Sequence, residues 1–431
     1  MSTVHAPQGT DHRALRFLTA GSVDDGKSTL IGRLLYDSRA ILADQLDTLE
    51  KKAAGSAIDL SLLTDGLEAE REQGITIDVA YRYFATRTRK FIIADAPGHE
   101  QYTRNMVTAA AGSDAAVVLV DITKLDTAQS AEPVKLLAQT RRHALLAQLL
   151  RVPSIVFAIN KLDAVADPGA AYAAVRASLL AFADEAGIEV AGVIPVSALR
   201  GDNVTQPLDV DWYDGPSLLQ LLESLPTAQE RKVGDLLIPV QYVARDGDGT
   251  GDQPRVLWGR IAHGRVQAGD TVQLFPSGER ATVTEVRIAG SRVEAAAAGQ
   301  SAGLLLDRQL DVSRGDWIGT PQTMTEARRF SATLAWLDTE PAVVGRKYWV
   351  RHGNRWVQAR ITAIESRLDI HTLAATDAHE LAVNDIGHVL VETQQPLPIE
   401  AYETNRVGGS LIVVDPTTNR TSGALLVKAA S

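Results

Sequence analysis

Eight consecutive residues near the N-terminus, Gly21 to Ser28, match the pattern G-x-x-x-x-G-K-[ST]. Glycines let a backbone turn close around a phosphate, and the N–H groups of a following helix supply partial positive charge. We expect Lys27 to reach the β- and γ-phosphates of a nucleotide and the Ser28 hydroxyl to bind Mg²⁺. The predicted phosphate-binding residues are Gly21, Ser22, Val23, Asp24, Asp25, Gly26, Lys27, Ser28 and Thr29.

The residues on either side of this turn are predicted to position it. Residues 15–20 are typical of a buried strand, and residues 28–36 have apolar side chains at helical spacing. Further apolar runs alternate with helical patterns as far as residue 225, which predicts a doubly wound α/β P-loop domain with a mostly parallel sheet. The expected strands are residues 91–95, 115–121, 154–160 and 190–197, and the expected helices are residues 102–112, 128–149 and 170–186.

Two motifs follow expected strands at their C-terminal ends, where doubly wound sheets bind ligands. Asp95 ends one strand, where a carboxylate can join the Mg²⁺ shell, and the N–H of Gly98 can contact the γ-phosphate. The tetrapeptide from Asn160 to Asp163 ends another strand. The Asp163 carboxylate can accept two parallel hydrogen bonds from N1 and N2 of guanine, whereas adenine offers no such pair of donors.

Base recognition is expected to involve two segments. The predicted guanine-binding residues are Asn160, Lys161 and Asp163, with the Lys161 stem on the base plane, and Ser197, Ala198 and Leu199, with backbone N–H groups near guanine O6. Each motif alone also fits an ordinary strand-ending turn. Their order and spacing together favour a GTP-binding domain.

Residues near the γ-phosphate are predicted from their position between these motifs. Thr76 is expected to offer its hydroxyl to Mg²⁺ and its backbone to the γ-phosphate, as a switch that is released after hydrolysis. His99 is the predicted catalytic residue and orients the attacking water. Val23 and Ile75 are predicted to form an apolar gate that separates His99 from this water until a partner docks. Without this context, Thr76 also fits a strand and His99 an exposed loop.

The second half of the chain has a different pattern. After residue 226, short strands alternate with Gly, Pro and Asp turns, which predicts small β-barrels. Strands are expected at residues 240–243, 255–261, 271–275, 281–288 and 302–306, followed by a second β-rich block over residues 329–427. The predicted organisation is a flexible N-terminus (1–13), a P-loop GTPase domain (14–228), β-barrel domain 2 (229–322) and β-barrel domain 3 (323–431).

Composition narrows the class of protein. A net charge of −10 argues against broad binding to nucleic acid or to an anionic membrane, although paired arginines at residues 141–142 and 328–329 leave room for a local basic patch. The absence of cysteine excludes disulfides and thiolate metal sites and fits a cytoplasmic protein. Neither a signal peptide nor a run of ~20 apolar residues is visible in the sequence.

Taken together, the motifs resemble those of translational-type GTPases, which have the G domain and two β-barrels of elongation factor Tu. The match is closest to the GTPase (large) subunit of bacterial heteromeric sulfate adenylyltransferase. In elongation factors the position of Asp25 is usually His. The segments that carry the resemblance are residues 16–37, 65–84, 97–106, 139–143, 259–261, 384–387 and 402–406.

The resemblance implies a function in sulfate assimilation. In that family, adenosine 5′-phosphosulfate and pyrophosphate form from ATP and sulfate, and GTP hydrolysis on the large subunit drives this uphill reaction. The expected ligands are GTP and Mg²⁺, and the expected partner is a smaller adenylyl-transfer subunit in a heterodimer or larger hetero-oligomer. The sequence contains no H-x-G-H motif, which agrees with adenylyl transfer on the separate subunit, and it contains no second P-loop pattern, so we expect no fused adenylylsulfate kinase.

Two other functions use the same nucleotide site. An elongation-factor-like GTPase would carry aminoacyl-tRNA, but the acidic composition and Asp25 argue against it. A regulatory GTP-switch scaffold would bind a partner without driving a reaction. GTP-dependent tRNA binding would favour the first alternative, and GTP turnover that ignores the small subunit would favour the second.

Overall fold

The structure is a computed structural model, and it divides into two compact units. The first comprises residues 1–228 with 370–373, and the second comprises the remaining residues to 431. The residues described are 14–41, 60, 79–96, 106, 109–110, 112–127, 133–227, 234–245, 254–322, 324–369, 372 and 374–430. The domain limits given above are not tested by this division and stay predictions.

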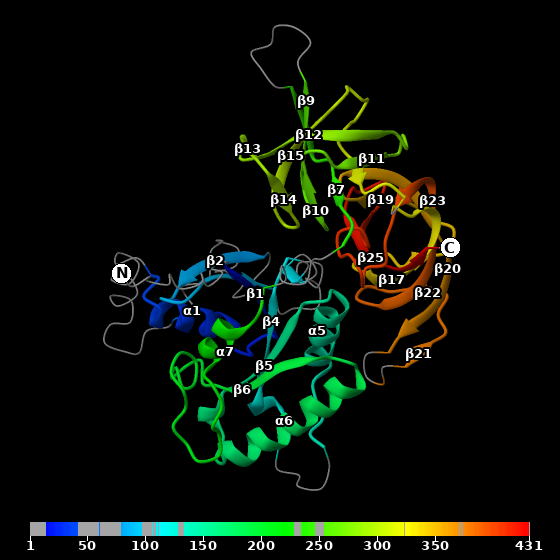
Figure 1. Cartoon of the computed structure of the whole chain (residues 1–431). Helices are drawn as coiled ribbons and strands as arrows, with labels where there is room; N and C mark the ends of the chain where they lie inside the picture. Colours follow the sequence, from blue (N-terminus) through cyan, green and yellow to red (C-terminus); the bar gives the residue numbers. More distant parts are fainter. Residues whose placement is uncertain are drawn as a thin grey trace, which may run out of the picture. The chain divides into compact units, whose positions relative to one another are not determined.

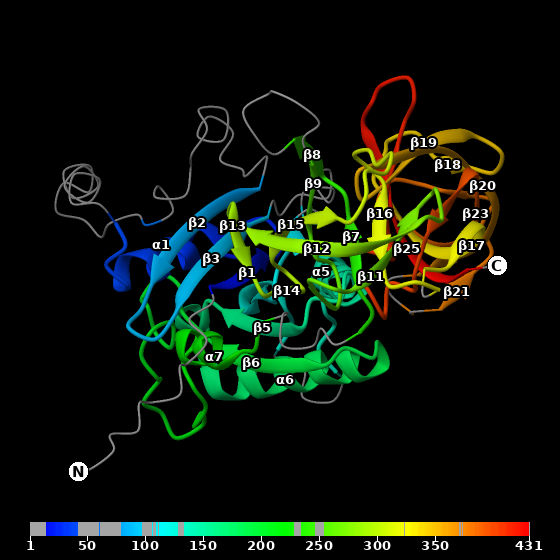
Figure 2. The same cartoon turned by 45° about the horizontal axis from the view of Figure 1, so that its top comes forward.

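The first unit is built on a six-stranded sheet of order β2-β3-β1-β4-β5-β6, whose strands can be followed in Figure 1 and Figure 2 together. Strand β2 is antiparallel to β3, and the other neighbours are parallel. The predicted doubly wound, mostly parallel sheet is therefore confirmed. The strands are β1 (Leu15–Ala20), β2 (Ala80–Ala85), β3 (Lys90–Asp95), β4 (Ala115–Asp121), β5 (Ser154–Asn160) and β6 (Val190–Pro195).

Helices cover both faces of this sheet (Figure 1). Leu30 and Leu34 of α1 share one apolar core with Leu218 and Leu222 of α7, so these two helices pack on the same face. Helix α5 packs against β4 and β5, and α6 packs against β6. The helices are α1 (Lys27–Asp37), α5 (Ala138–Leu149), α6 (Pro168–Glu185) and α7 (Leu218–Ser224), with short 3₁₀ turns η3 (Ile122–Lys124) and η4 (Leu162–Ala164).

The boundaries of two predicted elements in this unit are wrong. The helix expected over residues 128–149 begins at Ala138, after an extended residue at Leu137. Residues 133–137 are not helical, although their apolar spacing continues that of the helix, so this spacing does not mark where the helix begins. The strand expected to reach residue 197 ends at Pro195, and the sequence analysis missed β2 and α7 altogether.

The second unit consists of β-strands that form two sheet systems. The first has the strand order β7-β16-β11-β12-β15-β9-β8, with β13 paired to β12 and a separate β10-β14 pair. Its strands are β7 (Leu237–Pro239), β8 (Tyr242–Arg245), β9 (Arg255–Arg260), β10 (Arg265–Gln267), β11 (Thr271–Phe275), β12 (Arg280–Ile288), β13 (Ser291–Val293), β14 (Ala295–Ala297), β15 (Ser301–Leu306) and β16 (Trp317–Gly319). One strand was expected over residues 240–243, but the chain forms β7 and β8 with Val240 and Gln241 between them.

The last sheet system closes into a barrel of six strands. Its order is β19-β24-β25-β17-β23-β20, and β20 pairs back to β19. The strands are β17 (Glu326–Trp336), β18 (Ala342–Val343), β19 (Lys347–His352), β20 (Arg355–Leu368), β21 (Ala375–Thr376), β22 (Glu380–Leu381), β23 (Ile386–Pro398), β24 (Ser410–Val414) and β25 (Thr421–Ala430). Alternate residues point inward and form its apolar core, as expected for a small closed barrel.

Candidate nucleotide-binding site

The loop between β1 and α1 has a backbone that requires glycine. Gly26 has a φ of +92°, and an added Cβ would lie 2.4 Å from Nδ2 of Asn160. Asp24 also adopts a positive φ, of +62°. This left-handed geometry turns the chain tightly enough to bring successive N–H groups to one side, which is the arrangement that binds an anion.

The N-terminus of α1 supplies further donors to this loop. The first helical hydrogen bond runs from Leu30 N to Gly26 O at 2.9 Å, so the N–H groups of Lys27, Ser28 and Thr29 precede the helical ladder. No side chain caps this end of the helix. The hydroxyl oxygen of Ser22 is buried without a hydrogen-bond partner in the structure. Together these groups form a cradle that fits a chain of phosphates.

Lys27 lies across the same loop. Its Nζ donates to the carbonyl oxygens of Gly21 and Ser22, each at 2.9 Å. Burial lowers the pKa of Lys27 below its ordinary value, while the carboxylates of Asp95 and Asp25 act in the opposite direction. A desolvated ammonium group gains strongly from an added anion, so its position is suited to the β- and γ-phosphates.

Ser28 and Asp95 are the two residues predicted from the sequence to bind a divalent cation through side-chain oxygen atoms. Asp95 is buried at the end of β3, and its Oδ1 accepts a hydrogen bond from Oγ1 of Thr19 at 3.2 Å. A hydroxyl and a carboxylate fit Mg²⁺, which typically takes one or two protein ligands and completes its shell with phosphates and water. Within the described ranges there is no cluster of three or more His, Asp or Glu side chains, so a site made of protein ligands alone is not present there.

Asn160 connects the three nucleotide motifs. Its Nδ2 donates to the backbone oxygen of Asp25 at 2.8 Å, and its Oδ1 accepts from the N–H of Ala198 at 2.9 Å. Both ends of this buried amide therefore hold the phosphate loop beside residues 197–199, and we call these two hydrogen bonds the Asn160 brace. The order of the motifs along the chain predicted that they lie together, and these two bonds show how they are held.

The remaining base-recognition residues surround this brace. Lys161 has a φ of +66°, and Asp163 is mostly buried 3.9 Å from Nε of Arg200. Leu199 is exposed, and its carbonyl oxygen accepts from Nη2 of Arg33 at 2.6 Å. The structure therefore places Asn160 at the end of β5 and the other five predicted guanine-binding residues in the segments that follow β5 and β6.

Two side chains near the loop were not singled out from the sequence. Lys124 pairs with Asp25 at 2.8 Å, and Asp121 pairs with Lys161 at 2.7 Å. The sequence feature that could have identified Asp121 was its position at the end of a predicted parallel strand, because such strand ends converge on the ligand site.

Four predicted residues lie outside the described part of the chain. They are Ile75, Thr76, Gly98 and His99. Val23, the other member of the predicted gate, is half-buried, and its carbonyl oxygen accepts from Nζ of Lys124 at 2.5 Å. The gate, the switch and the catalytic histidine therefore stay predictions.

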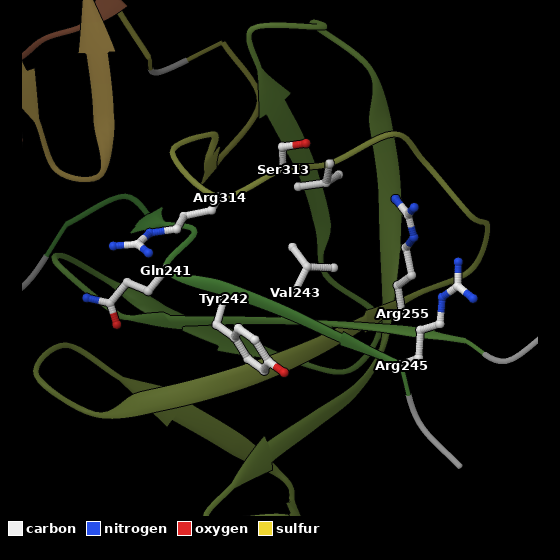
Figure 3. Close-up of a pocket in the computed structure, with 8 residues that line it drawn as sticks. Gln241, Tyr242, Val243, Arg245, Arg255, Ser313 and Arg314 are labelled. Carbon is white, nitrogen blue, oxygen red and sulfur yellow. The ribbon is translucent and has the colours of Figure 1, made fainter. Parts of the chain in front are cut away.

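A basic depression of about 400 Å³ lies on the second unit, in the sheet that contains β8 and β9. Figure 3 shows Arg245 and Arg255 on one side, Arg314 on the other and Tyr242 between them. The paired arginines at 141–142 and 328–329, which left room for a local basic patch, do not line this depression. The patch combines residues from separate segments, which sequence proximity cannot reveal.

Among the residues that the structure describes, no helix combines the length and apolar character needed to cross a bilayer.

Known proteins match both halves of the chain. The family model "Elongation factor Tu GTP binding domain" matches residues 12–229, and "GTP-eEF1A C-terminal domain-like" matches residues 329–428. Sulfate adenylyltransferase subunit 1 of Laribacter hongkongensis is 44% identical over 425 residues, which cover 96% of this chain and 85% of that protein. The protein of the same name from Shewanella woodyi is 41% identical, over 96% of this chain and 87% of its own length.

Longer relatives also match. The "Bifunctional enzyme CysN/CysC" of Xylella fastidiosa is 44% identical over 95% of this chain, which spans 65% of that protein. The resemblance identified from the nucleotide motifs is thus confirmed over almost the whole chain. The chain belongs to the family of sulfate adenylyltransferase subunit 1, with a GTP-binding domain of the elongation factor Tu type.

Proposed function

We propose that this chain hydrolyses GTP to drive the formation of adenosine 5′-phosphosulfate and pyrophosphate from ATP and sulfate. Adenylyl transfer takes place on a separate, smaller subunit, and the two form a cytoplasmic heterodimer or larger hetero-oligomer. The observation that carries this proposal is the similarity to sulfate adenylyltransferase subunit 1 along 96% of the chain. The two reactions are coupled only if the GTP-bound and GDP-bound forms contact the partner differently.

The described residues support the binding half of the proposal. The phosphate loop, which Asn160 holds through the backbone oxygen of Asp25, receives the phosphates together with Lys27, and Asp163 accepts hydrogen bonds from the guanine edge. Ser28 and Asp95 would hold Mg²⁺, which would supply positive charge to neutralise the β- and γ-phosphates. Thr76 completes this site in the GTP-bound form.

His99 orients the water that attacks the γ-phosphate. GTP and water become GDP and inorganic phosphate, and the histidine acts through its contact with the water more than by removing a proton completely. Val23 and Ile75 keep His99 away from this water until the partner docks, which prevents GTP turnover without adenylyl transfer.

Reconstitution with the smaller subunit tests the proposal. GTP turnover and adenosine 5′-phosphosulfate formation are measured together, with and without ATP and sulfate. We expect the partner and its substrates to accelerate GTP hydrolysis, and Lys27→Met to abolish both reactions while Lys135→Met, an exposed residue, leaves them unchanged. GTP turnover that is the same with and without the partner would favour the regulatory scaffold.

A separate measurement tests the alternative function as a carrier of aminoacyl-tRNA. Filter binding of aminoacyl-tRNA to the GTP-bound chain is expected to give no retention above that of the GDP-bound chain. Tight GTP-dependent retention would contradict the sulfate function proposed here and favour the elongation-factor alternative.

A further inference from the structure

Four charged side chains alternate in sign between the phosphate loop and the base-recognition loop. Nζ of Lys124 lies 2.8 Å from Oδ1 of Asp25 and 3.8 Å from Oδ2 of Asp121, and Nζ of Lys161 lies 2.7 Å from the same Asp121 oxygen. We call Asp25, Lys124, Asp121 and Lys161 the charge ladder. Asp121 ends β4, and the other three members lie in the segments that follow β1, β4 and β5, so the ladder crosses the nucleotide site.

Lys124 contacts the phosphate loop at two points. In addition to Asp25, its Nζ donates to the carbonyl oxygen of Val23 at 2.5 Å. The second carboxylate oxygen of Asp25 accepts from the N–H of Ser22 at 2.6 Å. Lys124 therefore holds the carboxylate that in turn holds the first residues of the loop, and the direction of the loop N–H groups depends on this contact.

The position of Lys124 is itself fixed by Asp121. Asp121 caps the turn η3, because its Oδ1 accepts from the N–H and the hydroxyl of Thr123 at 3.0 and 2.6 Å. Burial acts to raise the pKa of Asp121, but the hydrogen bonds from Lys161 and Thr123 lower it below its ordinary value. Asp121 is therefore ionised at neutral pH and attracts both lysines.

The charge of Lys124 matters because Asp25 is completely buried. Its side chain has 0% exposure and lies in the loop that receives phosphates. A buried carboxylate without a cation is strongly unfavourable, and a polyphosphate beside it would add repulsion. Lys124 reduces both the cost of burying the Asp25 carboxylate and its repulsion of the phosphates, because it neutralises Asp25 in the loop that binds them.

We infer that Lys124 is a positioning residue for nucleotide binding, which neutralises Asp25 and fixes the phosphate loop in its receiving shape with Asp121 as its anchor. This inference rests on the GTP site described under Proposed function. It adds a residue outside the three motifs to the determinants of GTP and GDP affinity.

A double-mutant cycle tests the inference by equilibrium titration of the whole chain with fluorescent GDP and Mg²⁺. Lys124→Met removes the ion-pair partner of the buried Asp25, so we expect about tenfold weaker binding or more. Asp25→Asn removes the buried charge and keeps an oxygen for the Ser22 N–H. The variant with both changes should therefore bind no more weakly than Lys124→Met alone, and Lys124→Arg should restore most of the affinity.

Controls separate the possible outcomes. Lys135→Met changes an exposed lysine of the same region and should bind like the wild type. Nucleotide-free melting temperatures establish folding, and Lys124→Gln provides a second neutral variant if Lys124→Met does not fold. Additive losses in the cycle, or wild-type affinity in Lys124→Met, would overturn the inference while the GTP site stands. A wild-type chain that binds no GDP would instead refute the proposed function.

Discussion

We predict that His352 makes the stability of the second unit depend on pH. It ends β19, is completely buried and stacks on Trp317 of β16 with ring centroids 4.5 Å apart and an angle of 20°. Nε2 donates to the carbonyl oxygen of Gly408 at 3.0 Å, while Nδ1 has no hydrogen-bond partner. A proton added at Nδ1 would therefore create a buried charge between two sheets. Burial lowers the pKa of His352 from 6.5 to about 4, although the bond to Gly408 acts to raise it.

The sign and size of the effect follow from this pKa. Between pH 6.5 and about 4, the unfolded chain binds a proton at this position and the folded chain does not. The free energy of unfolding therefore decreases as the pH falls through this window, and the contribution is fully present above pH 6.5. The gap between the two pKa values, at about 1.4 kcal/mol per pH unit, corresponds to about 3 kcal/mol. This is a large part of the stability of an ordinary domain.

His352→Gln isolates this contribution. Gln keeps a donor for the Gly408 carbonyl and cannot take up a proton in this range. We expect hydrogen exchange of peptides covering β16 and β19 to accelerate in the wild type as the pH falls from 7 to 4.5, after correction for intrinsic exchange. The acceleration should be much smaller in His352→Gln and unchanged in His379→Gln, an exposed control. Parallel pH profiles for wild type and His352→Gln would refute the reasoning.

The nucleotide site gives three further predictions. Gly26→Ala places a Cβ 2.4 Å from Asn160 Nδ2 in a left-handed backbone, so GDP affinity measured by calorimetry should fall at least ~30-fold; a smaller loss would contradict the role of the Asn160 brace. Asp163→Asn should shift preference from guanine to xanthine nucleotides, and unchanged GTP affinity in a nucleotide titration would count against this base contact. His99→Ala should bind GTP normally and hydrolyse it ~10²-fold more slowly, whereas single-turnover rates equal to the wild type would remove His99 from the mechanism.

Local sequence signals were enough to predict the phosphate loop and its setting. Gly26 and Lys27 have functions that depend on backbone freedom and charge, and both properties can be recognised from the residue type and its spacing. The buried strands β1, β4 and β5 were predicted with their observed limits, because strands covered on both faces are almost uniformly apolar.

Features that depend on tertiary contacts could not be predicted in this way. In the sequence, Lys124 cannot be told apart from a charged surface residue. Only the folded turn η3 brings its amine to Asp25. Similarly, the arginines of the basic depression are separated along the chain and are brought together only by the sheet that contains β8 and β9. Strand β2 was missed because its exposed tyrosines, Tyr81 and Tyr83, lie on one face and break the apolar pattern.

The contacts among the described residues also indicate which groups can distinguish GTP from GDP. The Asn160 brace and the charge ladder join protein atoms to protein atoms, so neither contact depends on whether a γ-phosphate is present. Contacts that are equal in two states cannot transmit free energy between them. The difference must therefore arise at groups that touch the γ-phosphate itself, and the predicted groups are Lys27 in the described part of the site, together with Thr76, Gly98 and His99. On this argument, changes at Lys124 or Asn160 weaken GTP and GDP binding together, whereas changes at Thr76 alter the ratio of the two affinities.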